Sequence, residues 1–181
     1  MLYADDSSIA LQRVRHLLLV RDPYDWVLAR ARFFLSDTFQ GSLDHLKGGN
    51  VAVEDMLNMM IFGIPEKAPT LSEIYTHNAV SWLGTSARVL KFEDLIQHVR
   101  ALETDAAECF FAGLFVGLGM GALRDDWRDR VRIGSDREQS GTARENLAGA
   151  VTDVPEELPD LQKRLVDYAA PGLRAVLGYE G

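Results

Sequence analysis

The pattern of apolar and polar residues predicts two short β-strands among stretches of helical periodicity and polar loops. The first, Leu17–Val20, is entirely apolar and ends at Arg21, which predicts a buried β-strand. The second, residues 88–92, also predicts a strand, and Glu93-Asp94 begins the helix that follows it. Because helical stretches alternate with these two strands, we expect the strands to pair in parallel through a crossover connection.

The residues after the first strand indicate a tight turn into a helix. Asp22 is a good helix N-cap, and Pro23 suits the first helical position because its missing N–H is not needed there. Asp25 would lie in the first turn, where a negative charge is favourable. From Trp26 to Phe34 the apolar positions form one broad face, which predicts a helix.

Periodicity predicts further helices at 9–14, 51–62, 70–82 and 105–117, and a final amphipathic helix within 155–181. Thr70 and Glu73 have the spacing of a capping box. We expect the methionines of 51–62 to fill the core and Cys109 to be a buried structural thiol. The inward face of the last helix is predicted to consist of Leu161, Leu165, Val166, Tyr168 and Ala169.

This pattern predicts an α/β fold that is rich in helices and has a small parallel sheet. Two parallel strands form a poor core by themselves, since such a sheet needs further strands and cover on both faces. We therefore expect that part of the sheet is missing from this chain or is supplied by another one. The length of 181 residues predicts one domain over 1–181.

Composition narrows the classes of partner. The formal net charge of −8 argues against nonspecific binding to nucleic acid or to an anionic membrane. The single cysteine, the lack of metal-ligand spacing and the absence of an apolar leader predict a protein of the cytoplasm with no metal site. A local basic group remains, formed by Arg13, Arg15, Arg21, Arg30 and Arg32.

Arg21 admits two interpretations. It can pair with Asp22 or Asp25 as a structural element of the turn. It can also bind an anion, since ligands of open α/β sheets bind at the carboxyl ends of strands and a helix N-terminus offers N–H groups to a phosphate.

Three segments resemble motifs of the sulfotransferases that use 3′-phosphoadenosine 5′-phosphosulfate (PAPS), and they occur in the order of that family. Residues 21–29, Arg-Asp-Pro-Tyr-Asp-Trp-Val-Leu-Ala, resemble its 3′-phosphate-binding motif. Residues 89–95, Val-Leu-Lys-Phe-Glu-Asp-Leu, resemble its strand-then-helix element. Residues 142–149, Thr-Ala-Arg-Glu-Asn-Leu-Ala-Gly, resemble its late glycine-containing loop, and the ending Leu-Gly-Tyr is also similar.

The resemblance implies the C-terminal portion of a P-loop-like sulfotransferase fold and PAPS as the sulfuryl donor. It implies that Arg21 and Arg144 hold the 3′-phosphate, a task that suits the fixed fork of guanidinium donors. Thr142 would add a hydroxyl donor, and Phe92 would lie near the adenine. The partner would be a small-molecule acceptor with a hydroxyl or an amine.

The chain also departs from the family pattern. Ala29 replaces a serine that donates to the 3′-phosphate, Glu145 replaces a lysine, and Val151 replaces a tryptophan. Neither the glycine-rich loop with its lysine nor the catalytic histidine is recognisable, so no catalytic residue is assigned.

We therefore expect the chain to be inactive in sulfuryl transfer by itself. The alternative is a degenerate, non-catalytic module for nucleotide binding or assembly, in which a second copy or a partner chain completes the sheet.

Overall fold

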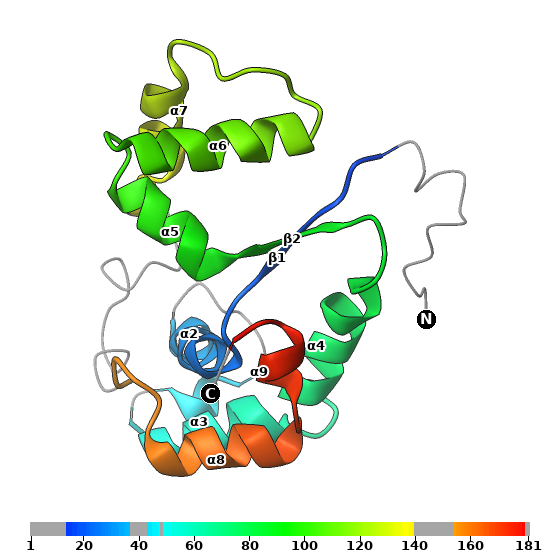
Figure 1. The fold of residues 1–181 in the computed structure, drawn as a ribbon. Helices are drawn as coiled ribbons and strands as arrows, with labels where there is room; N and C mark the ends of the chain where they lie inside the picture. Colours follow the sequence, from blue (N-terminus) through cyan, green and yellow to red (C-terminus); the bar gives the residue numbers. More distant parts are fainter. Residues whose placement is uncertain (1–13, 37–42, 48, 140–153, 180–181) are drawn as a thin grey trace. The chain divides into compact units, whose positions relative to one another are not determined.

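A computed structural model describes residues 14–36, 43–47, 49–139 and 154–179 (Figure 1). The chain divides into two compact units. The first comprises the residues up to Arg21 and His77–Asp136, and the second comprises Asp22–Thr76 and Arg137–Gly181. The prediction of a single domain stays a prediction.

The first unit is built on two parallel strands, β1 (Leu17–Val20) and β2 (Arg88–Lys91). Leu17 is registered with Arg88 and Val20 with Lys91, so the predicted parallel pairing is confirmed. The second strand ends one residue earlier than predicted, because Phe92 already belongs to the following helix. The helical elements of this unit are η2 (Val80–Trp82), α5 (Phe92–Arg100), α6 (Asp105–Gly117) and α7 (Trp127–Gly134).

The hydrophobic core of this unit lies between β2 and the three helices that follow it. Its buried members are Leu90, Leu102, Phe111, Leu114 and Trp127. The prediction that the first strand is fully buried is wrong, because Leu17 is 39% exposed and Leu19 48% exposed. The prediction of a buried Cys109 is also wrong, since α6 turns Phe111 toward the core and leaves the thiol exposed.

Two arginines bind backbone carbonyls in the C-terminal half of α6. Arg88 donates to the Gly113 carbonyl at 2.6 Å, and Arg15 donates to the Gly117 carbonyl at 3.3 Å. Cations are favoured at this end of a helix by its dipole. The glycines let the guanidinium groups approach, since a Cβ at Gly119 would lie 2.7 Å from Arg15 Nε.

The second unit is helical. It contains α2 (Pro23–Leu35), η1 (Asp44–Leu46), α3 (Val53–Phe62), most of α4 (Leu71–Asn78), η3 (Arg137–Gln139), α8 (Asp160–Ala169) and α9 (Leu173–Val176). Helices α2, α3 and α8 contact one another (Figure 1). Met56 and Met60 of α3 are at most 1% exposed, so their predicted core role is confirmed. Helix α3 ends at Gly63, whose φ of 78° favours glycine.

The predicted caps of α2 and α4 are confirmed. Asp22 accepts a hydrogen bond from the Tyr24 N–H, and Pro23 occupies the first turn. Thr70 and Glu73 form the reciprocal capping box, with bonds of 2.8 and 3.1 Å. Helix α4 ends at Asn78, short of the predicted Trp82, and the separate turn η2 follows.

The inward face predicted for the last helix is only partly correct. Val166 of α8 is buried, whereas Leu161 is 54% exposed and Tyr168 78% exposed. The buried position one turn before Val166 is Gln162, whose Nε2 donates to the Asn58 side chain of α3 at 3.4 Å. A polar core residue on α8 therefore shifts the inward face away from the most hydrophobic positions.

The described residues thus form a helix-rich α/β protein with a two-stranded parallel sheet, the predicted class. Within these residues, no helix is long and apolar enough to cross a membrane.

Candidate functional site

The structure brings together two of the four predicted ligand-binding residues, Arg21 and Phe92. Arg21 directly follows the last residue of β1, and Phe92 directly follows the last residue of β2. Since Val20 and Lys91 are registered partners, both side chains start from the carboxyl end of the same parallel pair. The Arg21 guanidinium carbon lies 4.6 Å from the centre of the Phe92 ring, which is a cation–π contact.

The remaining predicted site residues, Thr142 and Arg144, lie outside the described residues, as do the departures Glu145 and Val151. Ala29 lies on α2 and is half-buried. The contribution of Thr142 and Arg144 to a site stays a prediction.

The N-terminus of α2 is largely occupied by its own side chains. The Asp22 carboxylate accepts the Tyr24 N–H at 2.9 Å, and Pro23 has no N–H to offer. We expected the backbone N–H groups at the start of this helix to be free for a phosphate, and this is wrong for the N–H of Tyr24. An anion near this turn would depend on side-chain donors more than on the helix backbone.

Arg174 of α9 neutralises the capping carboxylate. Its Nε and Nη2 donate to the two Asp22 oxygens at 3.1 and 2.9 Å, and both side chains are less than one fifth exposed. The hydrogen bond to Asp22 raises the pKa of Arg174. The charge of Asp22, the residue after Arg21, is thus compensated within the second unit.

The same arginine stacks on Tyr24, with its guanidinium carbon 4.0 Å from the ring centre. The Tyr24 hydroxyl is 2.9 Å from both oxygens of Asp167 on α8 and donates to that carboxylate. Burial and the hydrogen bond to Asp167 raise the pKa of Tyr24. Neither Asp167 nor Arg174 could be recognised from the sequence, because neither stands in a motif and both are more than 140 residues from their partners.

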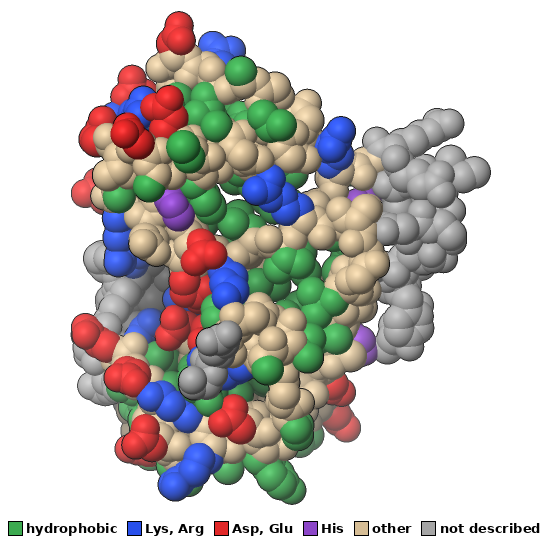
Figure 2. Space-filling view, viewed as in Figure 1, with side chains coloured by type: hydrophobic (Ala, Val, Ile, Leu, Met, Phe, Trp, Pro, Cys, Tyr) green, Lys and Arg blue, Asp and Glu red, His purple; other side chains and the backbone are tan. Residues whose placement is uncertain are grey.

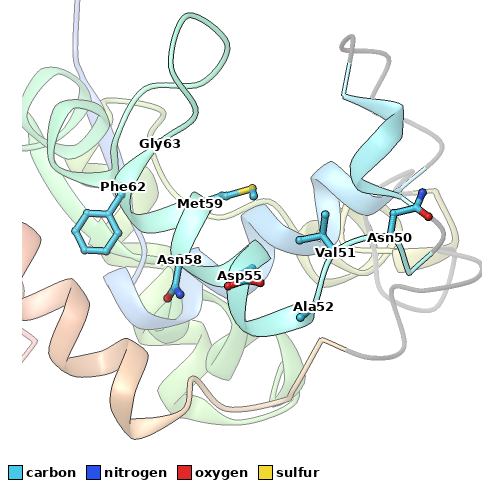
Figure 3. Close-up of a pocket in the computed structure, with 8 residues that line it drawn as sticks. All are labelled: Asn50, Val51, Ala52, Asp55, Asn58, Met59, Phe62 and Gly63. Atoms are coloured by element: carbon cyan, nitrogen blue, oxygen red, sulfur yellow. The ribbon is translucent and has the colours of Figure 1, made fainter.

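An open hollow of about 560 Å³ lies along the outer side of α3 (Figure 3). Its polar side chains are Asn50, Asp55 and Asn58, and its larger apolar ones include Met59 and Phe62. A smaller hollow of about 480 Å³ is lined by the turn after α3 and the start of α4. Neither hollow includes a predicted site residue. In the part of the chain that the structure describes, no group of three His, Cys, Asp or Glu residues could hold a metal ion.

The surface of α6 and α7 carries several ion pairs, which Figure 2 shows as intermixed acidic and basic side chains. Arg128 pairs with Glu108 at 2.5 Å, and Arg132 pairs with Asp129 and Glu103 at 2.6 and 2.8 Å. Exposed pairs of this kind stabilise by less than about 1 kcal/mol each.

Comparison with known proteins found no matching family model, no similar curated protein and no similar solved structure.

Proposed function

We propose that this chain is the C-terminal portion of a sulfotransferase-like domain that binds PAPS through its 3′-phosphate. The finer fold assignment, a P-loop-like sulfotransferase fold, belongs to the same proposal. The observation that supports it most is that Arg21 lies at the carboxyl end of a parallel strand pair and contacts Phe92. Each of these residues belongs to one of the segments that resemble sulfotransferase motifs. Ligands of open α/β sheets bind at such an edge.

The donor set at this edge suits a phosphate. The guanidinium group of an arginine carries its N–H donors in a planar fork that matches the oxygens of a phosphate. One face of the Arg21 guanidinium plane stacks on the Phe92 ring. This contact fixes the orientation of the plane, and therefore the directions in which its N–H groups point. Arg21 would hold the 3′-phosphate, and Arg144 would join it from the late loop.

When bound, PAPS would supply a sulfuryl group for an acceptor hydroxyl or amine. The residues assigned here bind and orient the nucleotide, and none of them is assigned as the base that activates the acceptor. The printed sequence contains no glycine-rich loop with a Lys-Ser/Thr ending to grip the 5′ side. We therefore expect this chain to bind the nucleotide without transferring its sulfuryl group.

Calorimetric titration with adenosine 3′,5′-bisphosphate tests this function. We expect Arg21→Ala to weaken binding about ten- to a hundredfold, since a hydrogen-bonded charged contact is worth about 1.5–3 kcal/mol. Arg100→Ala is the matched control, because Arg100 is an exposed arginine of α5 in the same unit and removes the same charge. Equal binding by the wild type and Arg21→Ala, or no binding by a folded wild type, would refute the proposal.

An assembly module is the second candidate, and the exposed apolar side chains of β1 favour it. Leu17 and Leu19 are 39% and 48% exposed on a strand whose alternate residue Val20 is buried. A second copy or another chain that completes the sheet would cover them. Light scattering tests this candidate: a dimer that Leu19→Lys dissociates would support it, whereas a monomeric wild type at high concentration would exclude self-assembly.

A further inference from the structure

We infer that Phe92 is a positioning residue, which holds the Arg21 guanidinium in the orientation that receives the 3′-phosphate. This inference rests on the proposed function and deepens it. It assigns to Phe92 a role that acts through another side chain, in place of the direct contact with the adenine implied by the resemblance.

The geometry of the two residues carries the inference. The guanidinium carbon of Arg21 lies 4.6 Å above the Phe92 ring centre, well within the 6 Å range of a cation–π contact. Phe92 is the first residue of α5 and follows β2 without a loop, so its backbone is fixed by a strand on one side and a helix on the other. The ring is therefore a fixed surface against which the Arg21 guanidinium stacks.

The platform has a consequence for affinity. An arginine side chain has many rotamers, and it loses part of this conformational freedom when it binds a ligand. A guanidinium that is already stacked has lost part of that freedom before binding, which lowers the cost of holding the phosphate. The ring face under Arg21 is also occupied, so a purine base cannot stack on that face.

The role can be measured with a double-mutant cycle on the full chain. Binding of adenosine 3′,5′-bisphosphate is titrated for the wild type, Phe92→Leu, Arg21→Ala and the double variant. We expect Phe92→Leu to weaken binding about two- to fivefold, the factor that one such contact supplies. Phe92→Tyr keeps an aromatic face and should stay within about twofold of the wild type.

The cycle separates positioning from direct contact. If Phe92 acts through Arg21, Phe92→Leu has no further effect in the Arg21→Ala background. It also leaves the binding of adenosine 5′-monophosphate unchanged, since that ligand has no 3′-phosphate. Additive effects in the cycle, or weaker binding of both nucleotides, would overturn the inference while leaving the proposed function intact.

A measurement on the ligand-free protein tests the inference even if a variant fails to fold or no nucleotide binds. The NMR resonance of the Arg21 Nε–H should show a ring-current shift in the wild type and in Phe92→Tyr, and lose it in Phe92→Leu. An unshifted resonance in the wild type would overturn the inference. If the wild type has the shift but binds no nucleotide, the proposed function fails and the inferred role falls with it.

Discussion

Arg30 of α2 should be one of the most sensitive positions for the stability of the second unit. Its side chain is 8% exposed, and its guanidinium donates to the backbone carbonyls of Met60 and Pro69, each at 2.9 Å. Burial lowers the pKa of Arg30, so the hydrogen bonds must offset a desolvation cost. The residue joins α2 to the end of α3 and to the segment before α4.

The substitution Arg30→Met tests this function of the guanidinium. Methionine keeps an unbranched apolar stem for the Trp26 and Phe34 rings, which lie 5.0 and 5.4 Å from the guanidinium carbon. Two hydrogen bonds from a charged donor contribute about 1.5–3 kcal/mol each, and their loss leaves two carbonyls without this donor. Taking the lower value because of the desolvation cost, we expect a loss of about 3 kcal/mol.

Urea denaturation measures the effect on the unit that contains Arg30. The ¹⁹F resonance of 5-fluorotryptophan at Trp26 reports that unit, since the other tryptophans, Trp82 and Trp127, belong to the first unit. Arg164→Met is the control, because Arg164 is exposed on α8, and it should change stability by less than about 0.5 kcal/mol. If Arg30→Met and Arg164→Met unfold at the same urea concentration, the reasoning about Arg30 is wrong.

Three further predictions concern the second unit. Glu66 has a φ of 60° in the turn after α3, a backbone conformation that is strained for a residue with a side chain. Glu66→Gly should therefore raise the free energy of unfolding, measured in urea, by about 0.5–1 kcal/mol. An unchanged urea midpoint would show that this backbone is not strained. Gly63→Ala should lower the free energy of unfolding by about 2 kcal/mol or more, since φ is 78° and a Cβ would lie 2.7 Å from the Ala68 carbonyl oxygen. A variant as stable as the wild type would show that the backbone adapts to the added methyl group. The pKa of Tyr24 is raised above 10.0 in the folded state, so its stabilising contribution is complete below pH 10 and disappears as the pH rises through the folded pKa. Tyr24→Phe should therefore lose stability less steeply than the wild type above pH 10, and parallel pH profiles would contradict this linkage.

Local signals predicted the elements on which the candidate site depends. The apolar run before Arg21, the N-cap Asp22 and the capping box at Thr70 are short-range features, and the structure confirms each of them. Parallel pairing followed from the alternation of strands and helices, and it placed Arg21 and Phe92 at the same end of the sheet. The contact between these two residues is a consequence of that register.

Features that depend on long-range packing could not be predicted in this way. Arg30 appeared as one of a local basic group, but the carbonyls that accept its hydrogen bonds lie 30 and 39 residues away. Gln162 takes a core position on α8 because Asn58 of α3 is there to pair with it. The exposure of Cys109 depends on which face of α6 meets Trp127, a residue that the periodicity did not place on a helix.

A crystal structure of the chain with adenosine 3′,5′-bisphosphate tests the central claim most directly. We expect the 3′-phosphate to lie at the carboxyl ends of β1 and β2. Its oxygens should accept hydrogen bonds from the Arg21 guanidinium, which should still be stacked on Phe92. A nucleotide bound elsewhere, or a crystal soaked at millimolar concentration that contains none, would contradict it.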